Sequence, residues 1–171
     1  AVILDGTDIT YEKEYKRSKY IGHLFQDPMK GTAPHLTIEE NLALAARRGK
    51  RRTLRIGITK AEREQYRELL KTLDLGLEDR LTARVGLLSG GQRQTLALLM
   101  ATMTPIDFLI LDEHTAALDP KTAEIVMQLT NKVVQEKHLT TLMVTHNLRH
   151  AVEYGDRLLM ILVLSLIHIS E

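Results

Sequence analysis

The pattern of apolar and polar positions divides the chain into three parts. Residues 1–35 contain short apolar runs that predict a short strand within 1–10, ending at the turn Asp5-Gly6, and another strand at 20–25. Residues 36–88 show the three- and four-residue spacing of amphipathic helices, and from 89 to 161 helical segments alternate with continuous apolar runs. The pattern therefore predicts two sheet-forming parts that are separated by a mostly helical insertion.

Two helix starts in the insertion are marked by capping boxes. Thr37 with Glu40, and Thr59 with Glu62, have the spacing in which each side chain bonds the backbone N–H of the other residue. Gly76 is expected to end the second helix, because glycine readily adopts the left-handed conformation that follows a helix. The insertion is thus expected to hold at least two capped helices.

The last part of the chain alternates strictly between helices and strands. Helices are expected at 89–102, 121–136 and 147–154, and strands at 108–111, 140–145 and 157–163. Continuous apolar strands are typical of a parallel sheet that is covered on both faces. The predicted fold class is therefore α/β, a parallel sheet flanked by helices with a helical subdomain inserted.

Composition narrows the classes of function. With 44% hydrophobic and 26% charged residues, the 171-residue chain has the composition of one ordinary globular domain. A net charge of +1 argues against nucleic acid as the main partner, because phosphate backbones are bound mostly by excess Lys and Arg. The absence of Cys excludes thiol and disulfide chemistry. The longest apolar run, 158–167, is shorter than the ~20 residues that span a bilayer.

A basic run lies inside the predicted insertion. It consists of Arg47, Arg48, Lys50, Arg51, Arg52 and Arg55. A contact with nucleic acid or with lipid headgroups is one interpretation of such a run. The nearly balanced charge of the whole chain and the lack of interleaved aromatic residues favour a solvated connector instead.

Two carboxylates follow the buried strand expected at 108–111. Asp112 and Glu113 come at its carboxyl end, where open parallel sheets bind ligands. There Asp112 can hold Mg²⁺ on nucleotide phosphates, and Glu113 can orient an attacking water or take its proton. His146 ends the next strand and is expected to emerge beside them. The alternative interpretation is that the two carboxylates only cap the following turn.

The segment Ser89-Gly90-Gly91-Gln92 opens a predicted helix. Its Ser-x-x-Gln spacing is itself a capping box. Capping does not require two glycines, however, and glycine lets an anion approach the exposed N–H groups of a helix start. Asp119, before Pro120, is expected to cap the next helix. The segment therefore predicts both a helix start and a phosphate contact.

Five motifs, in this order, resemble those of ABC-type ATPases over roughly residues 1–160. They are the glutamine loop Phe25-Gln26-Asp27-Pro28, the signature Leu88-Ser89-Gly90-Gly91-Gln92, the Walker B run Phe108-Leu109-Ile110-Leu111-Asp112-Glu113, the interface loop Ala117-Leu118-Asp119, and the switch histidine in Val144-Thr145-His146-Asn147. The chain is similar to the nucleotide-binding subunit of an ABC transporter, whose core is a P-loop NTPase-like fold.

The resemblance implies roles for the motif residues. Glu113 and His146 would be catalytic, and Asp112 and Gln26 would bind Mg²⁺. The ATP-binding set would be Gln26, Ser89, Gly90, Gly91, Gln92, Asp112 and Asp119. The implied cofactors are ATP and Mg²⁺, with ATP held between two subunits in a head-to-tail dimer.

The sequence departs from the family pattern at both ends. No G-x-x-x-x-G-K-[S/T] loop occurs in the 171 residues, so the Walker A loop is expected to precede residue 1. Without it, the chain alone is expected to bind ATP poorly and to hydrolyse it negligibly. Residues 162–171 do not continue as the family does and are interpreted as a foreign tail. The domain is thus expected to comprise 1–35, the helical 36–88, and the α/β part 89–161.

The expected partners follow from the same resemblance. They are transmembrane permease subunits, a second copy of the ATPase subunit and a separate solute-binding protein, without nucleic acid. The subunit would lie at the cytoplasmic face of the membrane, attached through the permease, and would power solute transport. The alternatives are a soluble ABC-type ATPase that acts on ribosomes or DNA, and a catalytically inactive ABC fragment.

Overall fold

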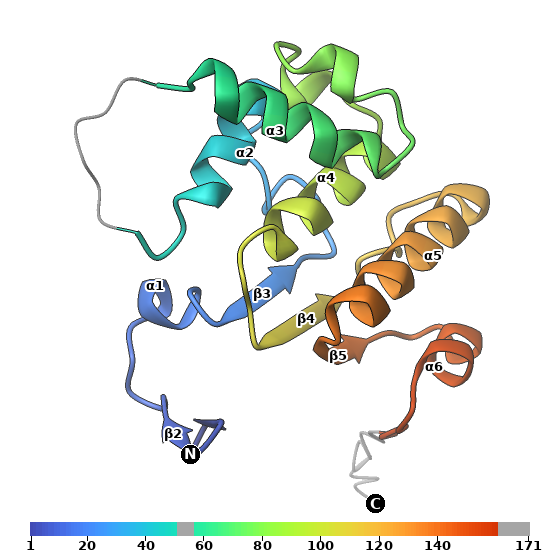
Figure 1. The fold of residues 1–171 in the computed structure, drawn as a ribbon. Coiled ribbons are helices and arrows are strands. Elements are labelled where there is room, and N and C mark those ends of the chain that lie inside the picture. The colour runs from blue at the N-terminus through green and yellow to red at the C-terminus, as the bar shows by residue number, and fades with distance from the viewer. Residues whose placement is uncertain (51–56, 161–171) are drawn as a thin grey trace, which may run out of the picture.

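The computed structural model describes residues 1–50 and 57–160 and has a parallel three-stranded sheet at its centre (Figure 1). The strands are β3 (Ile21–Leu24), β4 (Phe108–Asp112) and β5 (Thr140–Val144), in the spatial order β3-β4-β5. Leu24 pairs with Leu111, and Asp112 pairs with Val144. Because all three strands run the same way, their carboxyl ends meet at one edge, and the predicted parallel sheet is confirmed.

Two helices pack on the same face of this sheet. They are α4 (Gly90–Thr102) and α5 (Pro120–Lys137). The buried cluster between sheet and helices consists of Leu24, Ala97, Leu98, Ala101, Leu109 and Leu111, with Val133 and Val134 packed against it. On the opposite face Leu142 and Val144 remain 51% and 47% exposed. Within the described residues, the expectation that β5 is covered on both faces is therefore wrong.

The first ten residues form a hairpin, in which the expected strand ends at the predicted turn Asp5-Gly6 and a second strand follows. β1 (Ile3–Leu4) and β2 (Thr7–Asp8) pair antiparallel around the turn at Asp5 and Gly6. Both turn residues have positive φ, 46° and 77°, which is the geometry of a tight two-residue hairpin turn. A turn inside a short apolar run divides it into two strands. The short helix α1 (Glu14–Arg17) leads from this hairpin to β3.

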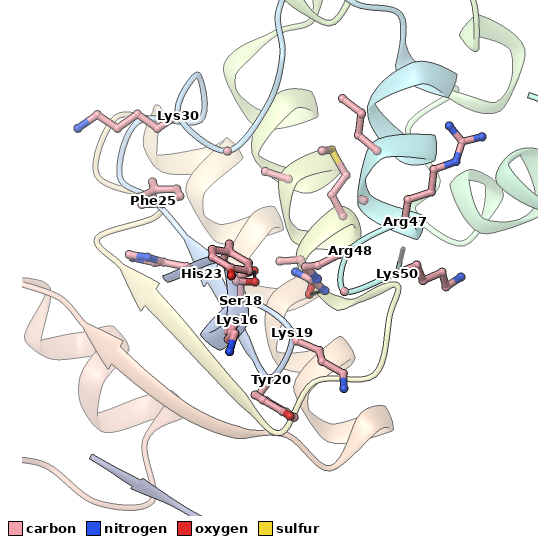
Figure 2. Close-up of a pocket in the computed structure, with 18 of the residues that line it drawn as sticks. Lys16, Ser18, Lys19, Tyr20, His23, Phe25, Lys30, Arg47, Arg48 and Lys50 are labelled. Atoms are coloured by element: carbon pink, nitrogen blue, oxygen red, sulfur yellow. Dashed lines mark hydrogen bonds between the residues drawn. The ribbon is translucent and has the colours of Figure 1, made fainter. Parts of the chain in front are cut away.

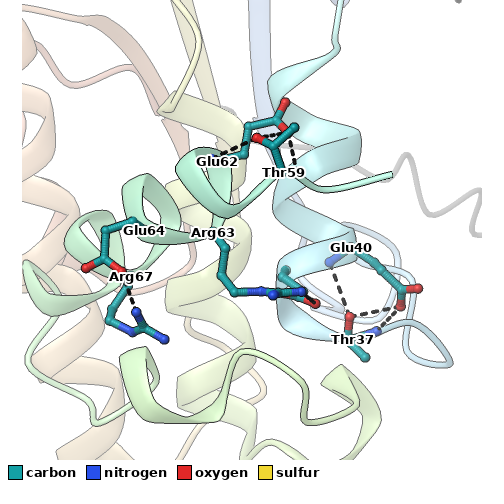
Figure 3. Close-up of polar contacts among 8 residues, drawn as sticks. Thr37, Glu40, Thr59, Glu62, Arg63, Glu64 and Arg67 are labelled. Carbon is teal, nitrogen blue, oxygen red and sulfur yellow. Dashed lines mark hydrogen bonds and ion pairs between the residues drawn. The ribbon is translucent and has the colours of Figure 1, made fainter. Parts of the chain in front are cut away.

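The middle of the chain is helical, as the apolar spacing predicts. It contains α2 (Ile38–Ala46) and α3 (Lys60–Lys71), followed by two short 3₁₀ turns, η1 (Glu78–Arg80) and η2 (Val85–Leu87). Both predicted capping boxes are present, Thr37 with Glu40 and Thr59 with Glu62 (Figure 3). The expectation that Gly76 ends the second helix is wrong, because α3 ends at Lys71. Asp74 is the first residue after it with positive φ, 52°, and Gly76 follows with φ 65°.

This helical part shares its apolar core with α4. Its buried cluster consists of Ile38, Leu42, Ala43, Tyr66, Leu70, Leu73, Leu77, Leu81, Val85 and Leu88, and it is closed by Leu96 and Leu99 of α4. A bidentate ion pair joins α3 to α2, with Arg63 Nε and Nη2 at 2.6 and 2.9 Å from the carboxylate of the buried Glu39 (Figure 3). Helix α4 thus belongs to two cores, one with the helical part and one with the sheet.

At the end of the described chain, the expected helix is present and the expected strand is not. Helix α6 (Leu148–Tyr154) occupies the expected place after β5. Residues 157–160 form no strand, so the strand expected at 157–163 is wrong there, and its remainder lies outside the described residues. The interpretation of 162–171 as a foreign tail also falls outside them.

Candidate functional site

Glu113 and His146 meet at the carboxyl edge of the sheet. Each follows a strand, and the backbone N–H of Glu113 donates to the carbonyl oxygen of Val144 at 2.9 Å. Glu113 has a positive φ of 43°, which turns the chain sharply at the strand end. His146 Nδ1 lies 3.2 Å from Glu113 Oε1, and the two side chains are 71% and 30% exposed. A histidine and a carboxylate are thereby presented together at an open sheet edge.

Asp112 and Gln26 lie at neighbouring strand ends on the same edge. Asp112 ends β4 and is half-buried, while Gln26 follows β3 by two residues and is exposed. Among residues 1–50 and 57–160, no group of three or more His, Asp or Glu side chains is gathered for a metal ion. This pair still fits Mg²⁺, because that ion is usually held by one or two protein oxygens, with phosphate and water completing its six ligands.

The Ser89–Gln92 turn is both a helix cap and a close packing contact. Ser89 Oγ accepts from the N–H of Gln92, and Gln92 Oε1 accepts from the N–H of Ser89, each at 3.2 Å. A Cβ on Gly91 would lie 2.2 Å from Cγ2 of Thr122, in the first turn of α5. The capping interpretation is therefore confirmed, and Gly91 also has a packing reason that the sequence did not reveal.

Asp119 caps α5 beside this turn. Its carboxylate accepts from the N–H of Thr122 at 3.1 Å, and the hydrogen bonds from Thr122 lower the pKa of Asp119. A Cβ on Gly90 would lie 3.1 Å from Cδ2 of Leu118. The structure thus brings the Ser-Gly-Gly turn and the loop ending at Asp119 together. Within the described residues, no hydrogen bond or ion pair joins this turn to Glu113 or His146.

Gln94 is a buried polar residue that sequence reasoning missed. Its side chain is fully buried, and its Nε2 donates to the carbonyl oxygen of Phe25 at 3.1 Å. Its Oε1 is buried with no hydrogen-bond partner in the described part of the chain. Phe25 precedes Gln26, so α4 holds the start of the glutamine-containing loop. The spacing of Gln94 two residues after Gln92 gave no sign of this contact.

A basic cavity of about 1280 Å³ lies between α1, β3, α2 and α4 (Figure 2). Its positive side chains are Lys16, Lys19, Lys30, Arg47, Arg48 and Lys50. Glu12 is the acidic side chain among the described residues that line it. Phe25 also reaches this cavity, which therefore adjoins the loop that carries Gln26.

The solvated-connector interpretation is wrong for one member of the basic run. Arg48 is half-buried and donates from Nη2 to the carbonyl oxygen of Ala101 at 2.7 Å, and from Nε to Thr104 Oγ1 at 3.1 Å. It therefore ties the end of α2 to the end of α4. Arg47 is exposed and bonds the carbonyl oxygen of Gly57. The remaining arginines of the run, at 51, 52 and 55, lie outside the described residues.

A parallel sheet with Asp112, Glu113 and His146 at its carboxyl edge places this chain in the class of open α/β proteins, which bind ligands at that edge. The comparisons with known proteins specify the family. A family model described as ABC transporter matches residues 1–116. The chain belongs to this family, as a transporter ATP-binding domain.

Relatives and solved structures agree with that assignment. A tyrosine transport ATP-binding protein of Clostridioides difficile is 49% identical over 160 residues, which are 94% of this chain and 63% of that protein. The thiamine import ATP-binding protein ThiQ of Histophilus somni is 35% identical over 156 residues, 91% of this chain and 67% of that protein. The chain thus spans less than two thirds of the first relative.

Two solved structures match this chain over a similar share of its length. The dimeric ATP-binding cassette MJ0796, in a post-hydrolysis state bound to ADP and phosphate, is 30% identical with a TM-score of 0.67, and the match covers 87% of this chain and 63% of that one. CbiO1 of Clostridium perfringens, at 24% identity and a TM-score of 0.69, shares the fold over 89% of this chain and 58% of that one. Within the described part of this chain, no helix has the length and apolar character that a membrane crossing requires.

Proposed function

We propose that this chain is the catalytic part of an ATP-hydrolysing subunit that powers an ABC transporter. The observation that carries the proposal is the Glu113–His146 pair, 3.2 Å apart at the carboxyl edge of the sheet. A carboxylate at this place orients the attacking water and accepts its proton, and the imidazole would lie beside the transferred phosphoryl group. Asp112 and Gln26 would hold Mg²⁺, which neutralises charge on the phosphates of bound ATP.

The second proposed element is a head-to-tail dimer. Ser89, Gly90, Gly91 and Gln92 would contact the ATP that is held mainly by the other subunit, because the helix start exposes N–H groups at a positive helix end. Asp119, in the adjoining loop, would lie at the subunit interface. The contact of Gly91 with Thr122 supports this pairing, since it makes the turn and the loop one surface. The dimeric state of the MJ0796 cassette is a precedent for it.

The third proposed element is the membrane partner. The basic cavity beside Phe25 would receive an acidic cytoplasmic segment of a permease, because its positive side chains outnumber its acidic one. The subunit would then lie at the cytoplasmic membrane face. The relatives that are named for tyrosine transport and thiamine import favour an uptake system, in which a solute-binding protein is a separate chain. The solute is recognised by those partners.

A fusion protein tests the catalytic proposal. The Walker A segment of a family member is joined ahead of residue 1, and Mg²⁺-dependent ATP hydrolysis is measured. The fusion is expected to hydrolyse ATP, and Glu113→Gln is expected to lower kcat by about 100-fold or more, because the proton acceptor is lost. Glu136→Gln, on the exposed side of α5, is the matched control and should leave kcat unchanged.

The chain without the added segment is expected to bind Mg-ATP poorly and to hydrolyse it negligibly, since no G-x-x-x-x-G-K-[S/T] loop occurs in its sequence. Isothermal calorimetry with Mg-ATP checks that expectation. A folded fusion that hydrolyses no ATP, or one that keeps full activity with Glu113→Gln, would contradict the catalytic proposal.

A further inference from the structure

Helix α6 is attached to the molecule through polar side chains. His150 is its one buried residue within the described part of the chain. Its Nε2 lies 3.9 Å from Oε2 of Glu124 on α5, and Tyr154 donates its hydroxyl to the other oxygen of the same carboxylate at 3.2 Å. The rings of His150 and Tyr154 are in edge contact, 6.1 Å between centroids. Both side chains thus contact the same carboxylate of α5.

His114 is a second buried histidine and packs on α5. It is 3% exposed, and its Nε2 lies 3.3 Å from Oγ1 of Thr130. The hydroxyl of Thr130 donates its proton to the carbonyl oxygen of Val126 at 2.7 Å, so His114 Nε2 must carry the hydrogen and donate. His150 is close enough for its charge to lower the pKa of His114. His114 thus contacts α5 through Thr130, and the charge of His150 on α6 acts on it.

These two histidines lie close in sequence to the Glu113–His146 pair. His114 follows Glu113 directly, and His150 comes four residues after His146. Asn147, directly after His146, caps the start of α6, because its Oδ1 accepts from the N–H of Arg149 and of His150. His146 itself is largely exposed, and among the described residues its side chain pairs with Glu113. Its position is therefore set mainly by where α6 begins.

We propose that His150 and Tyr154, which contact Glu124 of α5, are positioning residues that hold the His146 imidazole against Glu113. These three side chains, with the buried His114, form what we term the docking cluster. Neither histidine of the cluster belongs to the motifs that define the family resemblance. The proposal rests on the catalytic role proposed above for Glu113 and His146, and it concerns how that pair is kept at 3.2 Å.

The tautomer of His146 gives the proposal a spectroscopic signature. Because Nδ1 faces the carboxylate, which accepts hydrogen bonds and does not donate when ionised, neutral His146 must carry its hydrogen on Nδ1. An exposed histidine without such a partner has no hydrogen bond that fixes its tautomer. His35, exposed in a loop, serves as that internal reference. Imidazole ¹⁵N shifts distinguish the two tautomers in the full chain.

The experiment records ¹H–¹⁵N imidazole spectra of the labelled 171-residue chain at about pH 8.5, where histidines of ordinary pKa are neutral. The variants are His150→Phe, which keeps the ring and removes its nitrogens, and Tyr154→Phe, which removes only the hydroxyl. His150→Gln restores a polar group that can reach Glu124. Val152→Ala, at an exposed position of α6, is the matched control.

The wild-type chain is expected to show His146 mainly as the Nδ1–H tautomer and His114 as Nε2–H. The ratio of Nδ1–H to Nε2–H at His146 should fall about threefold or more in His150→Phe and by a smaller factor in Tyr154→Phe. His150→Gln should recover part of it, and Val152→Ala should leave it unchanged. If His150→Phe fails to fold, Tyr154→Phe decides the test.

A ratio unchanged in both phenylalanine variants while α6 stays helical would overturn the proposal, as would a wild-type His146 with the same tautomer balance as His35. No nucleotide is present in this measurement. Loss of ATP hydrolysis in the fusion protein would therefore refute the catalytic role without changing these spectra, and the two failures remain distinguishable.

Discussion

At the scale of single residues, Gly91 is required by packing as well as by its place in a phosphate-contacting turn. A methyl group at this position would meet Cγ2 of Thr122 at 2.2 Å. Gly91→Ala is therefore expected to lower the free energy of unfolding by about 1–2 kcal/mol, since overpacking exceeds the gain in helix propensity. Urea unfolding of the purified chain measures the change.

The partner substitution makes this prediction specific. Thr122→Ser removes Cγ2, and the next atom, Thr122 Cβ, would lie at an ordinary 3.7 Å from the new methyl group. The double variant should regain most of the stability that Gly91→Ala loses. Additive losses in the double variant would show that the contact with Thr122 is not the cause.

At the scale of elements, Arg48 connects the helical part to the sheet-bearing part. Arg48→Met removes its hydrogen bonds to Ala101 and Thr104 while keeping most of the apolar stem. The chain is expected to lose about 1–3 kcal/mol of unfolding free energy, because a half-buried carbonyl is left unpaired. Arg47→Met, one residue earlier and exposed, is the control and should change stability by less than about 0.5 kcal/mol. Equal losses in both variants would contradict this assignment.

Elements that depend on local rules were predicted from the sequence. The capping boxes at Thr37 and Thr59 set the starts of α2 and α3, because the bonded groups are three residues apart. Contacts between distant residues could not be predicted in this way. Arg48 bonds a residue 53 positions away, and Gln94 bonds one 69 positions away. No periodicity along the chain encodes such pairs.

The candidate site also contains some features that the sequence predicts and others that it does not. Strand order was enough to predict that Glu113 and His146 lie at one sheet edge, because parallel strands align their carboxyl ends. His114 and His150 belong to none of the five motifs, although each lies within four residues of the predicted catalytic pair. Their burial, at 3% and 8% exposure, depends on packing between distant segments. A histidine directly after Glu113 was the available signal.

At the scale of the whole molecule, α4 connects the functional parts. Its first residues form the Ser-Gly-Gly turn, Gln94 holds the chain before Gln26, and its end binds Arg48 beside the basic cavity. Movement of the cavity wall would therefore be transmitted along one rigid helix to the turn proposed to contact ATP. Such a connection is what coupling between a permease and a nucleotide site requires.

The stability of the whole chain should also depend on pH through His114. Burial, and next the charge of His150, lower the pKa of His114 from 6.5 to about 4. Above pH 6.5 the imidazole is neutral in both the folded and unfolded states, so it contributes no pH dependence. Between pH 6.5 and 4 the unfolded chain binds a proton that the folded chain does not. The free energy of unfolding should therefore fall by about 3 kcal/mol over this range from this residue alone.

A comparison of variants isolates this effect. Carboxylates such as Asp119, whose pKa is lowered in the folded state, also reduce stability as pH falls, but they do so equally in the wild type and in His114→Gln. Urea unfolding at several pH values should give a flatter profile for His114→Gln between pH 6.5 and 4, whereas the exposed His35→Gln should retain the wild-type slope. Parallel profiles for wild type and His114→Gln would mean that His114 is solvated in the folded chain, and that α5 and α6 do not enclose it.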